Sequence, residues 1–297
     1  MPLTFDRRVL RGPRPAGLYD GFVETRRMCP HCRAFITTSD RICPYCNEAV
    51  APRAARGGNP TPILGGFIPH ARFCTVIILL INIGLYIATS LVSMQSGRGS
   101  AMNIDVQTLF DFGAKYGPAI AIGQRWRLVT AGFLHGGLLH IGMNMWVLMD
   151  LGAGVEELYG AARMIVIYFI SSVLGFYVST MWNPGVPSVG ASAALFGLVG
   201  AMLALSIRHR GALGDHVRNV YLRYVIYMLI FSLLPGIDMA AHVGGLLGGF
   251  GMAWIAGQPG YGNFTRESIW KIAAVICIVI TAYSFLKMYL WFAHAPQ

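Results

Sequence analysis

The stretch VGASAALFG, residues 189–197, places a single hydroxyl group inside an apolar segment. A second apolar stretch, DMAAHVGG at residues 238–245, carries an imidazole in the same kind of setting. Both stretches belong to segments that are apolar enough to cross a membrane. A polar or ionisable side chain at membrane depth is costly, so Ser192 and His242 mark a candidate functional site. A nucleophile and a base buried together predict chemistry within the bilayer.

The composition around these segments is that of a membrane protein. Of the 297 residues, 55% are hydrophobic and 12% are charged, whereas roughly a quarter of residues are charged in soluble proteins. The formal net charge is +10. Because the basic residues flank apolar segments, membrane topology explains this excess better than nucleic-acid binding does. The first 60 residues are polar and rich in Arg, Pro and Gly, so we expect no signal peptide there.

The apolar pattern predicts an all-α polytopic membrane protein with seven spans, of which six form a core and the last is appended. A spanning helix needs roughly 20 apolar residues, and some of these segments are shorter. The predicted spans lie at 73–94, 138–155, 163–182, 191–207, 220–234, 239–256 and 270–292.

Composition also divides the chain into four regions. We expect a small cytoplasmic module at 1–50, a linker rich in Pro and Gly at 51–70, a six-helix core at 71–256, and an additional helix with a tail at 257–297. Eleven arginines precede the first span. Basic residues favour the cytoplasmic side, so the amino-terminal region is expected in the cytoplasm and Gln297 outside.

The amino-terminal module contains two Cys-x-x-Cys knuckles. Cys29 and Cys32 form the first, and Cys43 and Cys46 form the second after ten residues. Four thiolates can complete a tetrahedral zinc site that leaves no position open for catalysis. Disulfides conflict with a cytoplasmic location, and no βαβ pattern supports a thioredoxin-like redox pair. The spacing predicts structural Zn²⁺ in a zinc ribbon, with His31 as a knuckle residue rather than a ligand.

Ser192 follows a turn-forming stretch, NPGVPSVG at residues 183–190, and is therefore predicted in the first turn of its helix. The N–H groups of a first turn have no intrahelical partner, and the helix dipole favours negative charge there. An oxyanion could be stabilised beside its own nucleophile in such a place. The alternative is a serine that bonds back to its helix or mediates helix packing.

His242 follows Pro235-Gly236 on a helix that enters from the same side, so it is expected at a similar depth. The run GGLLGG at 244–249 contains two overlapping Gly-x-x-x-Gly pairs, which allow helix backbones to approach closely. Such packing would bring the imidazole to the hydroxyl. The alternative for His242 is a helix–helix hydrogen bond. Asp238 is expected either to orient the imidazole or to cap the helix.

A third polar cluster lies at His135, His140 and Asn144. The last two are four residues apart and share one helix face. Both can donate hydrogen bonds to a developing oxyanion. Metal ligation or polar packing in the core are alternatives, although no acidic residue or cysteine accompanies the cluster.

These motifs together resemble the rhomboid family of intramembrane serine proteases. The resemblance covers roughly residues 70–256 and leaves out the cysteine module. It implies a six-helix core, a Ser192–His242 dyad, and an oxyanion site made by His140, Asn144 and the Ser192 amide. It also implies that Phe196 packs against the His242 ring. The supporting residues of the resemblance are Trp126, Arg127, His135, Phe196 and Gly190.

Three positions depart from the family pattern. Ala193 stands where the family usually has Gly, and its methyl group could crowd the substrate strand or a neighbouring helix. Gln124 replaces a frequent Glu, and Met239 replaces a frequent Asn. None of these changes removes a catalytic group.

The resemblance predicts a serine endopeptidase that cleaves peptide bonds in or near transmembrane segments of other proteins. We expect no cofactor for catalysis, no nucleic-acid partner, and a bilayer location in a bacterial cytoplasmic membrane with the active site open to the outer side. The zinc module is a candidate site for a cytoplasmic partner. The rival is a non-catalytic relative that binds transmembrane helices, and a transporter is a distant third.

Overall fold

The computed structural model describes residues 26–29, 31–37, 40–50, 73–208, 212–257 and 264–294. The chain divides into two compact units, residues 1–61 and residues 62–297, and each is described by itself. The linker expected at 51–70 lies outside the described residues.

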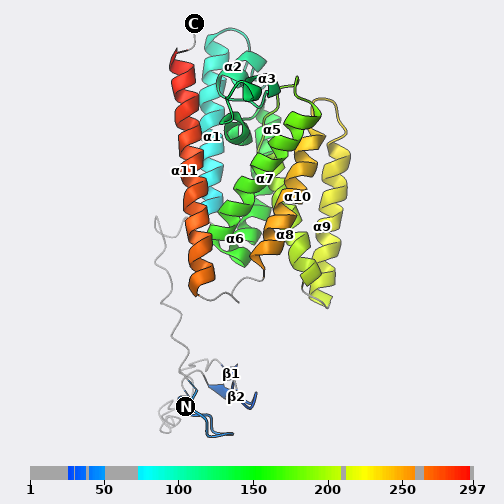
Figure 1. Ribbon diagram of the computed structural model, residues 1–297. Coiled ribbons are helices and arrows are strands. Elements are labelled where there is room, and N and C mark those ends of the chain that lie inside the picture. Colours follow the sequence, from blue (N-terminus) through cyan, green and yellow to red (C-terminus); the bar gives the residue numbers. More distant parts are fainter. Residues whose placement is uncertain are drawn as a thin grey trace, which may run out of the picture. The chain divides into compact units, whose positions relative to one another are not determined.

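The larger unit is a bundle of long helices (Figure 1). In its described part these are α1 (Phe73–Gln95), a continuous run of α5 (Leu138–Val147), the π-helical turn η4 (Leu148–Gly152) and α6 (Ala153–Tyr159), then α7 (Ala161–Trp182), α8 (Ser192–Arg208), α9 (Ala212–Phe231), α10 (Met239–Ala256) and α11 (Phe264–His294). The connection between α1 and α5 contains short helices: α2 (Val106–Asp111), α3 (Gly117–Ala121), α4 (Arg127–Thr130) and the 3-10 turn η3 (Ala131–Phe133).

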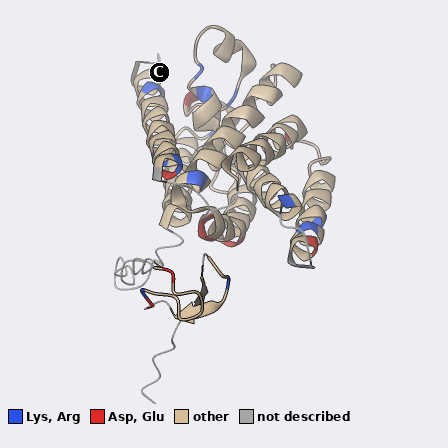
Figure 2. Cartoon of the chain, turned by 60° about the horizontal axis from the view of Figure 1, so that its bottom comes forward, with Lys and Arg blue, Asp and Glu red and all other residues tan. Residues whose placement is uncertain are grey.

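Five helical segments among the described residues are long and apolar enough to cross a membrane: Phe73–Gln95, Leu138–Tyr159, Ala161–Trp182, Met239–Ala256 and Thr265–His294. Helix α8 is apolar but shorter. Charged residues lie mostly toward the ends of the helices, with long uncharged stretches between them (Figure 2). This arrangement is that of a polytopic integral membrane protein.

Helix α9 differs from the span expected at 220–234. It begins at Ala212, eight residues earlier, and takes in an ion pair of 2.9 Å between Asp215 and Arg218. This first part contains charged and polar residues, so it does not belong to an apolar run although it is helical. The helix ends at Phe231, before Pro235, since residues that precede a proline disfavour the helical conformation.

Helices α7, α8 and α10 form the centre of the bundle, while α11 and α1 lie at one edge and α9 at the other (Figure 1). Glu156 accepts hydrogen bonds of 2.9 Å from the backbone N–H groups of both Cys74 and Thr75, which satisfies free donors at the start of α1. Arg163 of α7 pairs with Glu267 at 2.7 Å and ties α11 to the core.

The smaller unit contains an antiparallel hairpin of β1 (Arg26–Met28) and β2 (Phe35–Thr37), in which Met28 pairs with Phe35. Its small core consists of Cys29, Ile36, Cys43 and Val50.

Candidate active site

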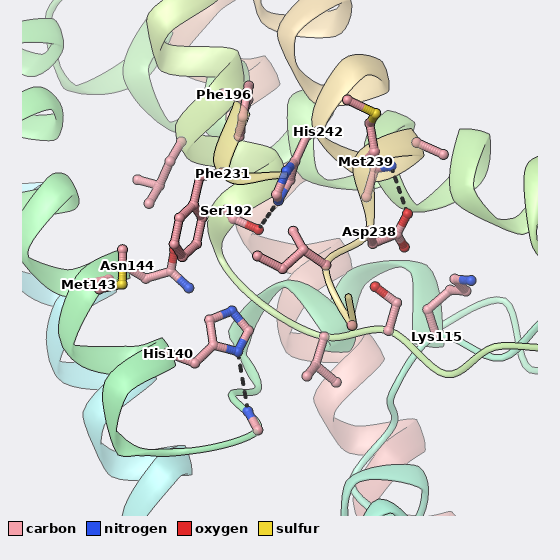
Figure 3. A pocket seen from close by; sticks show the side chains of 18 of the residues that line it. Lys115, His140, Met143, Asn144, Ser192, Phe196, Phe231, Asp238, Met239 and His242 are labelled. Carbon is pink, nitrogen blue, oxygen red and sulfur yellow. Dashed lines mark hydrogen bonds between the residues drawn. The ribbon is translucent and has the colours of Figure 1, made fainter. Parts of the chain in front are cut away.

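Ser192 and His242 meet at one end of the bundle. Ser192 is the first residue of α8, and His242 lies in the first turn of α10. The imidazole Nε2 of His242 and the hydroxyl Oγ of Ser192 are 2.7 Å apart, within hydrogen-bonding distance (Figure 3). Two residues 50 positions apart in sequence therefore form a nucleophile–base pair that could carry out acyl transfer.

Glycines on α10 make this approach possible. A Cβ atom at Gly245 would overlap the carbonyl oxygen of Ala193, and one at Gly249 would overlap that of Gly197. The backbones of α8 and α10 are thus in direct contact over more than one turn. The separation of the two helices, and with it the distance from Ser192 to His242, is set by main-chain atoms.

The imidazole of His242 is held on two further sides. Phe196 stacks on it, with ring centroids 4.3 Å apart and planes inclined by 16°. The hydroxyl of Ser232, just beyond the end of α9, lies 2.5 Å from Nδ1. Sequence reasoning missed Ser232, because a serine at the end of an apolar helix carries no distinctive signal.

Asp238 performs the capping role of the two that were considered. Its carboxylate accepts a hydrogen bond of 3.0 Å from the backbone N–H of Ala241 and another from the hydroxyl of Ser179. No side-chain hydrogen bond joins Asp238 to His242 within the described ranges. The pair of Ser192 and His242 is therefore built without a carboxylate on the imidazole.

His140 and Asn144 project from α5 toward the same space (Figure 3). The Nδ2 group of Asn144 is buried and has no hydrogen-bond partner among the described residues. The backbone N–H of Gly136 points at Nδ1 of His140 over 3.5 Å, so Nε2 is the nitrogen left to carry a proton. Both side chains can donate to an oxyanion that forms next to Ser192.

Gly190 is required by the way the chain enters α8. Its φ is +134°, a conformation that side chains rarely adopt. A Cβ atom there would also lie 2.8 Å from Nε2 of His140. Any other residue would strain the turn and displace a candidate oxyanion donor.

Of the other predicted residues, His135 contacts the site, whereas Trp126 and Arg127 lie in the connection between α1 and α5 and contact each other. His135 is fully buried and packs edge-on against His140, with ring centroids 5.1 Å apart. Arg127, also fully buried, lies over the Trp126 ring and donates a hydrogen bond of 2.6 Å to the side chain of Gln124. Gln124 thus acts as a neutral acceptor within this loop.

The site opens into a cavity of about 940 Å³ that is lined by residues of α5, α7, α8, α9 and α10 and by the loop before α8. Lys115 also lines this cavity. Its ammonium group donates to the carbonyl oxygens of Asn183 and Val186 at 3.0 and 2.9 Å. The lysine therefore holds the loop that leads to Ser192.

The methyl group of Ala193 does not face the cavity. Ala193 is fully buried in a cluster with Ala131, Phe176 and Ala241. A Cβ atom at Gly175 of α7 would lie 2.8 Å from this methyl, so the alanine fills space that the glycine leaves. Of the two effects considered for Ala193, the structure supports contact with a neighbouring helix and not crowding of a substrate strand.

The four clustered cysteines lie in the smaller unit. Their sulfur atoms all lie within 4.8 Å of one another, with 3.8 Å between Cys29 and Cys46 and 3.6 Å between Cys32 and Cys43. Hydrogen bonds from the backbone amide of Cys32 lower the pKa of Cys29 to about 6. The cluster has the donor set and the spacing to hold a metal ion.

Comparison with known proteins agrees with the geometry. The Rhomboid domain matches residues 122–259. Rhomboid-like protease 2 of Toxoplasma gondii is 31% identical over 231 residues, which are 70% of this chain and 79% of the relative.

The chain belongs to the rhomboid family.

Rhomboid protease GluP of Bacillus subtilis is 34% identical over 194 residues, 65% of this chain and 37% of that protein. Inactive RHOMBOID-like protein 8 of Arabidopsis thaliana is 32% identical over 124 residues, 41% of this chain and 35% of that protein. The chain spans between 37% and 56% of the length of four rhomboid relatives that it matches. Because one of these relatives is named as inactive, membership in the family does not by itself decide whether this chain is active.

Proposed function

We propose that this chain is an intramembrane serine endopeptidase that cleaves peptide bonds in or near transmembrane segments of other membrane proteins. The observation that carries the proposal is the 2.7 Å contact between Nε2 of His242 and Oγ of Ser192, within a cavity that Asn144 and His140 also line. Nucleophile, base and two candidate oxyanion donors converge on one space. The names of the protease relatives support the same reaction class.

In the proposed reaction, the Ser192 oxygen attacks the carbonyl carbon of the scissile bond while its proton passes to Nε2 of His242. The negative charge on the carbonyl oxygen is stabilised by His140, Asn144 and the Ser192 amide. When the C–N bond breaks, His242 gives the proton to the leaving amine. Water then attacks the ester, again with His242 as base, and releases the acid and the free serine.

A substrate must present an extended backbone to this site. Unpaired backbone N–H and C=O groups are expensive in lipid, so a helix that unwinds readily near the cavity is the easier substrate. We propose small residues at the cut and helix-breaking residues nearby as the preferred substrate class.

Reaction with a fluorophosphonate probe tests the nucleophile directly. The purified protein should be labelled at Ser192, and Ser192→Ala should not be labelled. Ser188→Ala is a matched control because it removes another hydroxyl from the same cavity wall, and it should retain labelling. A folded wild-type protein that never reacts would favour the rival, a non-catalytic relative that binds transmembrane helices.

The oxyanion assignment has its own test. Asn144→Ala should lower kcat by about 10²–10³, the usual cost of one such donor, unless His140 and the Ser192 amide compensate in part. An unchanged kcat with an intact fold would remove Asn144 from the oxyanion site.

We also propose that Cys29, Cys32, Cys43 and Cys46 bind one structural Zn²⁺. A tetrahedral ion with Zn–S bonds of about 2.3 Å requires sulfur atoms about 3.8 Å apart, and the observed pairs at 3.6 and 3.8 Å fit. Elemental analysis should find one zinc per chain that Cys29→Ser removes and Cys277→Ser retains. Zinc loss should leave fluorophosphonate labelling of Ser192 intact, and a folded module without metal would contradict the assignment.

The orientation of the chain in the membrane is proposed from the distribution of its basic residues alone. With the amino-terminal module in the cytoplasm, the end of the bundle that holds Ser192 faces outward, and water reaches it from that side. Accessibility of tags at the two termini tests this, and termini on one side would contradict it. Affinity capture with the amino-terminal module would test whether the zinc module has a cytoplasmic partner.

A further inference from the structure

Ser232, which directly follows α9, is more deeply buried than the residues around it in the sequence. It is the one fully buried residue between Asp215 and Ala240, a stretch in which the structure describes every residue. Its relative exposure is 3%, whereas every residue of α9 from Asp215 to Phe231 is half-buried or exposed. This burial places its hydroxyl against Nδ1 of His242, on the side of the imidazole opposite Ser192.

The hydroxyl of Ser232 has two short contacts and a single proton. Its Oγ lies 2.6 Å from the carbonyl oxygen of Met228 and 2.5 Å from Nδ1 of His242. A carbonyl oxygen can only accept, so the serine proton belongs on the bond to Met228. The oxygen of Ser232 must then accept from His242, which requires a proton on Nδ1.

A proton on Nδ1 also determines the protonation state of Nε2, the other ring nitrogen. A neutral imidazole carries one proton, so a proton on Nδ1 leaves a lone pair on Nε2, facing the Ser192 hydroxyl at 2.7 Å. That is the tautomer a general base needs. The opposite tautomer would donate to Ser192 and could not take its proton. Asp238 cannot supply this control, because its hydrogen bonds go to Ala241 and Ser179.

We propose that Ser232 is a positioning residue that holds His242 in the tautomer able to accept the Ser192 proton. The inference rests on the proposed protease function. It assigns to a neutral hydroxyl the orienting role that a buried carboxylate has in a Ser-His-Asp triad. Because Ser232 does not line the cavity, its effect should reach catalysis only through His242.

Nitrogen-15 NMR of histidine-labelled protein reads the tautomer without any substrate. The His242 signals, assigned by their loss in His242→Gln, should show a protonated Nδ1 and an unprotonated Nε2. In Ser232→Ala the two tautomers should mix. A wild-type ring protonated at Nε2 would overturn the proposal even if the protein proved inactive, so this result is separable from failure of the proposed function.

Kinetic measurements provide a second test of the role of Ser232. Ser232→Ala should lower kcat about tenfold, the scale of one hydrogen bond, with KM unchanged. Ser284→Ala is the matched control, because Ser284 is also buried and bonds back to the carbonyl four residues earlier, but on α11. It should leave kcat unchanged. If both variants keep wild-type kcat, or if Ser232→Ala changes KM alone, Ser232 does not position the base.

Discussion

Helices α10 and α9 both border the proposed catalytic cavity, yet they are attached to the bundle in different ways. Helix α10 contacts α8 and α7 through glycine backbone, with buried residues along its length. Helix α9 packs mainly against α8, and from Asp215 to Phe231 none of its side chains is fully buried. The first helix sets where His242 stands, and the end of the second contacts the far side of its ring.

The difference separates two requirements of the site. The distance between base and nucleophile depends on main-chain contacts, which change only if whole helices move. The orientation of the imidazole depends on side chains such as Phe196 and Ser232, which can be altered one at a time. Substitutions on the α10 side should therefore act on structure and activity together, and those on α9 on activity alone.

The largest effect is expected on the α10 side. Gly245→Ala places a methyl group on the carbonyl of Ala193 and forces α8 and α10 apart. Such overpacking costs about 1–3 kcal/mol of stability, and it should reduce fluorophosphonate labelling by at least about 100-fold because the 2.7 Å contact is lost.

Gly251→Ala is the control for that variant, since a Cβ atom there meets nothing within 4 Å on the same helix. It should keep labelling and be equally stable or up to about 1 kcal/mol more stable, because alanine is the better helix former. Equal damage by both substitutions would contradict the claim that backbone contact sets the dyad distance.

A smaller effect is expected on the α9 side. The hydroxyl of Tyr224 donates a hydrogen bond of 3.3 Å to Asp150, which links α9 to η4. Tyr224→Phe releases this exposed bond, whose net contribution is at most about 1 kcal/mol. We expect kcat/KM to rise by up to about threefold with Tm nearly unchanged, and Tyr283→Phe on α11 to have no effect. A tenfold loss of activity would show that α9 is as tightly constrained as α10.

The smallest effect on turnover is expected at Ala193. Ala193→Gly removes a methyl group that packs against α7, so it should lower stability by about 1 kcal/mol or somewhat more without raising turnover. Ala194→Gly on the same helix carries the same propensity cost and serves as the comparison. Turnover that rises severalfold only in Ala193→Gly would show that the methyl obstructs substrate after all.

The sequence was informative wherever a polar residue stood in an apolar segment. Ser192 and His242 were conspicuous there, and the glycine spacing after His242 indicated that two helices touch. The bounds of α1, α8 and α10 followed the apolar runs within one residue. Each of these signals is local, so it can be read without knowledge of the fold.

The remaining features depend on tertiary contacts. Ser232 resembles any serine that bonds back to its helix, and only the packing of α9 brings it to His242. Lys115 carries no signal in the sequence for its role, because only the folded chain brings it to two loop carbonyls. Helix α9 began earlier than its apolar run because helix formation and hydrophobicity are separate properties. The position of the Ala193 methyl required knowledge of Gly175 on another helix.

The central claim is that Ser192 and His242 together cleave a peptide bond at the membrane. The most direct measurement uses liposomes that contain the protein and a single-span test substrate with a helix-breaking residue near its outer end, followed by mass spectrometry of the fragments. Wild-type protein should cut at one bond, and Ser192→Ala and His242→Ala should each be slower by at least about 10³-fold while remaining folded. Cleavage by Ser192→Ala at the wild-type rate, or a folded wild-type protein that cuts no such substrate, would contradict the account.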